Sequence, residues 1–169
     1  ISFVTYYQPN SFPGVEMTDT TSMSTGNTYL FFISADAATT NNNHLYVNGV
    51  DNSTVAYNNG ASTLDLWNNG QVAIASGEAT QASSAINANV QFVYFTTNYI
   101  DFSQEANRNK FVDQLGYPRD LTQQIEDGDI ANPQVYMKFD PTVSLGTNSG
   151  TGGNFTVNGT VTAGSDFTK

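Results

Sequence analysis

The sequence lacks cysteine altogether and contains a single histidine, His44. The absence of cysteine excludes disulfide bonds, thiolate metal sites and cysteine nucleophiles, and it leaves the redox compartment open. A Ser-His-Asp triad or a multi-histidine zinc site would depend on His44 alone. That residue stands in the stretch NNNHLYVNGV beside a hairpin signal, so we expect a solvent-facing histidine at a strand edge.

Basic residues are scarce: five lysines and arginines stand against fifteen aspartates and glutamates, a formal net charge of −10. Nucleic acids and anionic membrane surfaces both attract basic segments, so we expect neither as a partner. No apolar run approaches the length of a membrane span. Charged residues make up only 12% of the chain, and asparagine, threonine, serine and glycine take their place. Such a surface offers hydrogen bonds without much charge, which suits virion parts and glycan-binding modules.

Short β-prone runs recur along the 169 residues, with turn residues between them. Many short strands at intervals of about 8–12 residues predict a β-sandwich or barrel, and we expect an all-β fold of two antiparallel sheets. A chain of this length buries about 70% of its unfolded surface, so we expect one domain over residues 1–169. The run YLFFISA is largely apolar and predicts a strand buried on both faces. The predicted strands are Ser2–Tyr7, Tyr29–Ala35, Leu45–Val47 with Val50 after the Asn48-Gly49 turn, Val55–Tyr57, Thr63–Trp67, Val72–Ala75, Val90–Thr96 and Val135–Phe139.

One stretch breaks the strand pattern. The sequence DFSQEANRNKFVDQLGYP predicts one short helix near residues 103–115. Ser103 is placed to cap its N-terminus, Gly116 stands at the position after its end, and Pro118 would stop it. The apolar residues that would share one helix face are Ala106, Phe111, Val112 and Leu115.

The stretch LGTNSGTGGNFTVNGTVTAG, residues 145–164, raises the question of whether its glycines cradle a phosphate or turn the chain. A phosphate-binding loop places lysine and then serine or threonine after its last glycine, and a helix follows. Here Gly153 is followed by Asn154, and the stretch contains no lysine. Two β-prone runs flank Asn158-Gly159, which predicts a closing hairpin and not a phosphate site.

Three stretches, taken in chain order, resemble known sequences. YLFFISADAATTNNNHLYVNGVD resembles the central part of laminin-G-like, concanavalin A-like domains: a buried strand, a short excursion with an aspartate (here Asp36), and an LYVNG hairpin. VQFVYFTTNYIDFSQEANRNKFVDQLGYPRDL and SLGTNSGTGGNFTVNGTV resemble the subgroup of such domains found in bacteriophage structural proteins. The resemblance covers roughly Tyr29 to Val161, and its most specific parts are SQEANRNKF and GTNSGTGGNF.

The resemblance implies a jelly-roll sandwich and a role outside catalysis. The first strands of such sandwiches normally precede an S-F-W strand, and the resemblance places Ser2-Phe3-Val4 at that strand. On that alignment the sandwich would lack its N-terminal strands, and a partner chain would supply the absent edge. We therefore expect a non-enzymatic virion surface component (a decoration, fibre or tail protein) at the virion or in the extracellular space. Its expected partners are other virion proteins and a cell-surface glycan, and we expect a homo-oligomer.

A glycan-active hydrolase, or a secreted carbohydrate-binding module of a cellular organism, is the alternative. Hydrolases of this fold resemble one another in a Glu-x-Asp-x-x-Glu strand motif, which this chain lacks. Retaining chemistry needs two carboxylates about 5 Å apart, and Glu16 and Asp19 have the wrong spacing for one strand face. Glu126, Asp127 and Asp129 stand in a turn-like context. With one histidine and no cysteine, we predict that the chain is not an enzyme.

Two binding sites are suggested, one by the resemblance and the other by residue type. Laminin-G-like domains often hold calcium at the sandwich rim, where Asp36, Asp51 and the EDGD run would offer oxygen atoms. We expect no cofactor, with calcium left open. Sugar binding calls for an exposed aromatic ring with amides beside it, although Trp67 would serve equally as a core residue. The candidate glycan-binding residues are Tyr57, Asn58, Asn59, Trp67, Asn68 and Asn69.

Overall fold

The computed structural model describes residues 2–7, 12–18, 22–58, 90–140 and 142–157. The strands predicted at 63–67 and 72–75 and the closing hairpin at Asn158-Gly159 lie outside these residues. The described chain is mostly strand with few short helices, and every strand pair is antiparallel, as predicted. Its strands are β1 (Ser2–Tyr7), β2 (Phe12–Thr18), β3 (Phe31–Ser34), β4 (His44–Val47), β5 (Val50–Asp51), β6 (Thr54–Asn58), β7 (Phe92–Phe95) and β8 (Val135–Lys138). The helices are the 3₁₀ turn η1 (Thr40–Asn42), α1 (Glu105–Arg108) and α2 (Thr122–Glu126).

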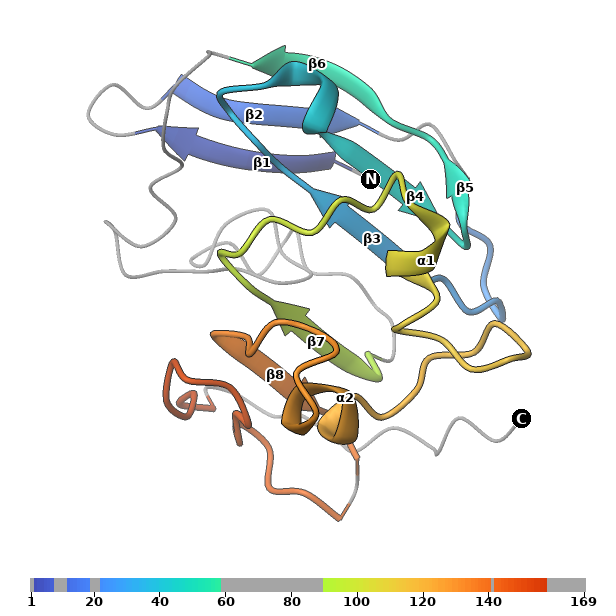
Figure 1. Ribbon diagram of the computed structural model, residues 1–169, viewed down its shortest axis with the longest axis vertical. Helices are drawn as coiled ribbons and strands as arrows, with labels where there is room; N and C mark the ends of the chain where they lie inside the picture. Colours follow the sequence, from blue (N-terminus) through green and yellow to red (C-terminus); the bar gives the residue numbers. More distant parts are fainter. Residues whose placement is uncertain (1, 8–11, 19–21, 59–89, 141, 158–169) are drawn as a thin grey trace. The chain divides into compact units, whose positions relative to one another are not determined.

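The described chain divides into two compact units, which we describe separately. The first unit contains β1 to β6 and returns with residues 99–121, which include α1. The second unit contains β7, α2, β8 and the residues that follow β8. Figure 1 shows the elements of each unit in sequence colours.

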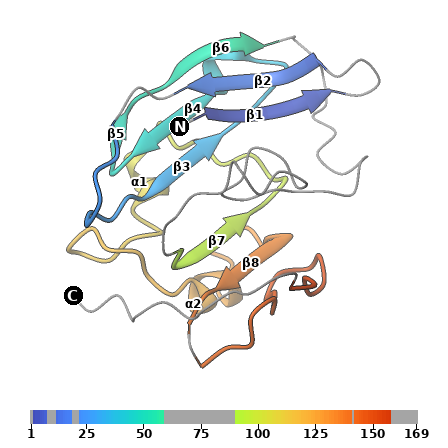
Figure 2. The ribbon, with the colours of Figure 1, turned by 180° about the vertical axis from the view of Figure 1, so that it is seen from behind.

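The first unit holds a three-stranded sheet with the order β1-β2-β6 (Figure 2). The central strand β2 was not predicted, because Pro13 and Gly14 mark this stretch as a turn. The register shows how the strand accommodates them: Thr5 pairs with Val15 and Tyr6 pairs with Pro13, so Gly14 is an extra residue. Such an extra residue is a β-bulge, and glycine commonly occupies one.

A second three-stranded sheet has the order β3-β4-β5. Asn48 and Gly49 join β4 to β5 with positive φ angles of 50° and 81°, the geometry that a tight two-residue hairpin requires. Val47 pairs with Val50 directly across this turn. The hairpin predicted from the Asn-Gly signal is therefore confirmed.

The core of the first unit lies between these two sheets. Val15 and Met17 of β2 are fully buried and pack in one cluster with Leu45 of β4. Ile33 of β3 and Val55 of β6 are partly buried against the same cluster. Both sheets thus contribute side chains to one common core within this unit.

The second unit is built on the antiparallel pair β7-β8. Val135 and Tyr136 of β8 are each 1% exposed. The Tyr94 hydroxyl donates to the Ala131 carbonyl at 2.6 Å, and burial raises the pKa of Tyr94 to about 12. Helix α2 was not predicted from the sequence. Within the described ranges, no helix has the length and apolar character that a membrane span requires.

The helix predicted near residues 103–115 is present but much shorter, because α1 covers only Glu105–Arg108. The chain then turns into a tight loop in which Val112 bridges to Pro118. The Asp113 carboxylate accepts the backbone N–H groups of Leu115 and Tyr117, both at 2.9 Å. These side-chain bonds give the backbone an alternative to the helix. Leu115 is consequently 73% exposed and does not share a buried face with Phe111, which is 3% exposed.

Candidate functional site

Residues 99–111, here called the strap, lie against the β3-β4 hairpin. Ser34 joins the two: its hydroxyl donates to the Ile100 carbonyl at 2.7 Å and accepts the Phe102 N–H at 3.1 Å. The Ser34 residue is 4% exposed, so both of its hydrogen bonds are made away from water. Because a buried hydroxyl is costly unless it is hydrogen-bonded, Ser34 fixes the position of the strap along the end of β3.

Three aromatic rings bury the strap against the hairpin. Phe32 of β3 packs on Phe102 and Phe111, with ring centroids 5.1 Å and 5.9 Å apart. The two strap rings meet each other edge to face at 5.6 Å. All three residues are buried. Because Ile33 packs against the buried cluster of the first unit while Phe32 packs on the strap, β3 is covered on both faces, as the run YLFFISA predicts.

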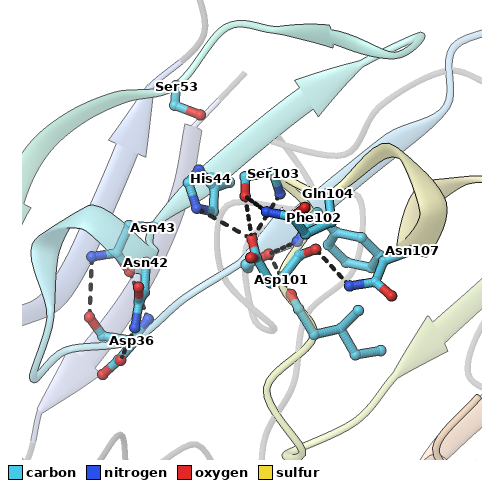
Figure 3. Close-up of polar contacts among 12 residues, drawn as sticks. Asp36, Asn42, Asn43, His44, Ser53, Asp101, Phe102, Ser103, Gln104 and Asn107 are labelled. Carbon is cyan, nitrogen blue, oxygen red and sulfur yellow. Dashed lines mark hydrogen bonds and ion pairs between the residues drawn. The ribbon is translucent and has the colours of Figure 1, made fainter.

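Asp101 organises the strap just before α1 (Figure 3). Its carboxylate accepts the hydroxyl of Ser103 at 2.6 Å and the Ser103 N–H at 2.9 Å. The Asn107 side-chain amide donates to the Asp101 carbonyl at 2.9 Å. Ser103 therefore does not cap the helix as predicted, since its hydroxyl is committed to Asp101 and Gln104 holds the capping position without a side-chain bond. The hydrogen bond from the Ser103 hydroxyl is the main cause that lowers the pKa of Asp101.

His44 is the first residue of β4 and lies beside this cluster. Its Nε2 atom lies 3.7 Å from Asp101 Oδ1, and its side chain is only 16% exposed. The prediction of a solvent-facing histidine at a strand edge is wrong, because β4 runs between β3 and β5 and the strap places Asp101 beside the ring. The ring also lies 6.3 Å from that of Tyr46, measured between centroids.

Serine, histidine and aspartate thus meet at one place, but in an order that does not activate the serine. A catalytic triad needs the hydroxyl bonded to the imidazole and the imidazole bonded to the carboxylate. In this cluster the carboxylate of Asp101 stands in the middle, with the Ser103 hydroxyl donating to it directly. The arrangement suits a turn that is held in place and not a nucleophile.

Arg108, the last residue of α1, bonds back to earlier residues of the strap. Its Nη1 donates to the carbonyl of Phe102 and, at 3.0 Å, to that of Ser103. The guanidinium carbon lies 4.1 Å from the ring centroid of Tyr46 on β4, which is a cation–π contact. Burial raises the pKa of Tyr46, and the nearby Asp51 carboxylate raises it further. One side chain therefore satisfies two strap carbonyls and also binds the strap to the hairpin.

We expect Arg108→Lys to lower the free energy of unfolding by about 1–2 kcal/mol, because lysine cannot reproduce a planar group that donates to two carbonyls and stacks on a ring. Urea titration measures this change. Arg119→Lys is the matched control at an exposed position, and we expect a smaller change there than at Arg108. Equal effects of the two substitutions would refute the role assigned to Arg108.

The two aspartates considered as calcium ligands are both bonded within their own loops. Asp36 Oδ2 accepts the Asn42 side-chain amide at 2.8 Å, which is the main cause lowering the pKa of Asp36. Asp51 accepts the Ser53 hydroxyl at 2.5 Å. Burial raises the pKa of Asp51, but the hydrogen bonds from Ser53 outweigh it and the pKa is lowered. Within the described ranges, no group of three or more His, Cys, Asp or Glu residues could hold a metal ion, and calcium stays a prediction.

The loop between β3 and β4 is closed by a buried asparagine. The Asn43 Oδ1 atom accepts the Asp36 N–H at 2.6 Å, and its Nδ2 donates to the Asp36 carbonyl at 3.0 Å. The Tyr99 hydroxyl donates to the Asn42 carbonyl at 3.0 Å and so ties the start of the strap to the same loop. These bonds hold the short excursion with Asp36 that separates β3 from β4.

The sequence raises the question of whether the glycine-rich loop binds phosphate or turns the chain. In the structure its backbone amides donate to carbonyls of β8 and of the residues just before it. The Ser149 N–H donates to the Tyr136 carbonyl at 2.8 Å, and the Gly152 N–H donates to that of Gln134 at 2.9 Å. A Cβ atom at Gly150 or Gly152 would lie 2.7 Å or 2.8 Å from the Gln134 carbonyl oxygen. The glycines thus allow close approach to the chain at the start of β8, and the backbone amides of residues 149–152 all donate to groups of the protein.

Asn148 holds this loop together. Its side-chain oxygen accepts the N–H groups of Tyr136 at 2.8 Å and Gly150 at 2.9 Å. Its side-chain amide donates to the carbonyls of Gln134 and Gly153, both at 2.9 Å. The residue is 9% exposed and uses all of its side-chain donors and acceptors in these bonds.

The predicted glycan-binding residues are described only in part. Tyr57 and Asn58 are the last residues of β6, which pairs with β2. Asn59, Trp67, Asn68 and Asn69 lie outside the described residues, so the glycan site stays a prediction. Among the carboxylates considered for hydrolysis, Glu16 belongs to the central strand β2, whereas Asp19 lies outside the described residues. Glu126 ends α2, and Asp127 and Asp129 follow it in an exposed turn.

Sequence reasoning missed Ser34, Arg108 and Asn148, which hold the strap and the glycine-rich loop. Ser34 is the only polar side chain inside the run LFFISA, and a lone polar residue in a buried strand signals a hydrogen-bonded contact. Arg108 and Asn148 stand in the two quoted motifs, but each also has a partner on a strand distant in sequence, Tyr46 of β4 and Tyr136 of β8. Only the folded chain brings those partners near.

Comparison with known proteins adds no relative. A scan against protein-family models and searches of curated proteins and of solved structures each found no match to this chain.

Proposed function

We propose that the chain is a non-enzymatic surface component of a bacteriophage particle, folded as a concanavalin A-like jelly-roll sandwich. The observation that carries the proposal is how the polar side chains of the two phage-like motifs are used. Asn107 and Arg108 bind backbone carbonyls of the strap, and Asn148 binds backbone groups of β8 and its own loop. Side chains that hold the backbone in this way favour a structural role over a catalytic one.

The surface composition supports contact with neighbouring proteins. The chain carries a formal charge of −10 but few charged residues, so most of its polar surface is uncharged. Leu115 and Tyr117 are 73% and 47% exposed on the loop that Asp113 fixes. Large apolar side chains on a rigid loop lose little entropy when a partner covers them. We propose a decoration, fibre or tail protein at the virion surface, with other virion proteins as partners and identical copies in a homo-oligomer.

Binding of a host glycan is the second part of the proposal. The candidate residues combine aromatic rings with amides, which suits neutral sugars. Repetition of one weak site by symmetry would raise the avidity of such binding without any new contact. The six residues of the site are Tyr57, Asn58, Asn59, Trp67, Asn68 and Asn69.

Trp67→Ala tests the glycan site and the assembly together. We expect the purified chain to sediment as an oligomer or to bind phage particles. We also expect the Trp67→Ala variant to bind glycans or cells at least about tenfold more weakly, because stacking of a ring contributes about 1–3 kcal/mol in comparable contacts. Circular dichroism controls for folding, and an unfolded variant would assign Trp67 to the core instead.

Two results would contradict the proposal. One is a stable monomer that binds neither particles nor cells. The other is measurable turnover of a polysaccharide that is lost in the Glu16→Gln or Glu126→Gln variant, which would favour the alternative of a glycan-active hydrolase. A monomer that binds soluble glycans alone would favour a carbohydrate-binding module of a cellular organism.

A further inference from the structure

The turn between β4 and β5 contains an Asn-Gly pair, Asn48-Gly49, whose chemistry is independent of the proposed function. In such pairs the backbone nitrogen of the glycine attacks the side-chain amide carbon of the asparagine and expels ammonia. The product is a cyclic succinimide, which water opens to aspartate or isoaspartate. Glycine offers no side chain to hinder the attack, and Asn48 and Gly49 are both exposed.

The Asn48 side chain is held away from this reaction by the segment that leads into β3. Its Oδ1 accepts the Leu30 N–H at 2.8 Å, and its Nδ2 donates to the Thr28 carbonyl at 3.3 Å. The Asn48 backbone N–H donates to the Leu30 carbonyl at 2.9 Å. The amide carbon must rotate toward Gly49 to react, and these bonds oppose that rotation.

We propose that Asn48-Gly49 is a deamidation site whose rate is controlled by release of residues 28–30 from the Asn48 side chain. The segment precedes β3 and is held to Asn48 by three hydrogen bonds, of which two involve the side chain. Thr28 is exposed and Leu30 is partly buried, so the segment can open without unfolding the sheet. Each opening frees the amide carbon for attack.

The modification would not be neutral. Aspartate at this position keeps an acceptor for the Leu30 N–H but places a carboxylate against the Thr28 carbonyl, where a donor stood before. Isoaspartate adds one carbon to the main chain of a two-residue turn whose ends, Val47 and Val50, are paired directly. Either product loosens the entry to β3, and neither reverts to asparagine spontaneously.

Peptide mapping by mass spectrometry of the full chain, incubated at mildly alkaline pH, tests the proposal. Mapping separates Asn48 from the other Asn-Gly pairs at 59–60, 69–70 and 158–159. We expect deamidation at Asn48 to be at least about tenfold slower in the folded chain than in the same chain unfolded by urea. Equal rates in the two states, or no product at Asn48 even in urea, would overturn the proposal.

A pair of variants tests the anchor itself. Leu30→Pro removes the N–H that Asn48 Oδ1 accepts, whereas Leu30→Ala keeps it and controls for the loss of the side chain. We expect the proline variant to deamidate at Asn48 faster than the alanine variant, and circular dichroism shows whether each is folded. If the proline variant fails to fold, hydrogen exchange of the Leu30 N–H in the wild-type chain reports release of the segment from Asn48, and a Leu30 amide that exchanges freely while Asn48 deamidates slowly would contradict the proposal. Equal rates in two folded variants would contradict control by residues 28–30.

Discussion

Replacing Phe111 with alanine is expected to lower the free energy of unfolding by about 3–4 kcal/mol, the largest single loss we anticipate in the strap. Phe111 is 3% exposed and packs on Phe32 and Phe102, whose rings lie 5.9 Å and 5.6 Å away. Its removal leaves a cavity between the hairpin and the strap that the flanking hydrogen bonds prevent from closing. Urea or thermal denaturation measures the loss.

Leu115→Ala is the matched control, because a continuous helix over 103–115 would place residues 111 and 115 on one buried face. Leu115 is instead 73% exposed on the Asp113 loop, so its removal should change stability by no more than about 0.5 kcal/mol. Similar losses in both variants would contradict the short helix and support the longer one.

Asn148→Ala is expected to cost roughly 3 kcal/mol, because it leaves four backbone groups without their side-chain partner. The groups belong to β8 and to the glycine-rich loop, so the loss should also speed hydrogen exchange at Tyr136 and Gly150. Chemical denaturation and hydrogen exchange measure the two effects.

Asn132→Ala provides the control for that experiment, since Asn132 is an exposed asparagine of the same unit. Its replacement should alter the free energy of unfolding by less than about 0.5 kcal/mol. An Asn148→Ala variant as stable as the wild type would show that the loop does not depend on this side chain.

The elements that sequence alone predicted are those specified by local chemistry. The β4-β5 hairpin follows from Asn48-Gly49, because this pair adopts the positive φ angles of a tight turn at little cost. The buried strand β3 follows from its apolar run. Strand β2 was not predicted, because Pro13 and Gly14 are typical turn residues. Only the pairing with β1 shows that Gly14 is the extra residue of a β-bulge.

The structure of the strap could not be predicted from the sequence, because its residues fit a helix locally and tertiary contacts override that preference. The Asp101 carboxylate accepts the Ser103 hydroxyl, and the Asp113 carboxylate accepts backbone N–H groups that would otherwise continue the helix. His44 and Tyr46 of β4 also lie against this segment, and no local sequence pattern indicates these contacts. The resemblance marked the segment as distinctive, whereas its contacts explain what its side chains do.

The central claim is that the polar groups of the motifs SQEANRNKF and GTNSGTGGNF hold the backbone and are not available to a ligand. Native-state hydrogen exchange of the glycine-rich loop, measured with and without inorganic phosphate, tests this claim most directly. We predict slow exchange at the amides of Ser149, Thr151 and Gly152, which donate to carbonyls of residues 133–136, and no change when phosphate is added. Fast exchange at these amides that slows on adding phosphate would contradict the claim.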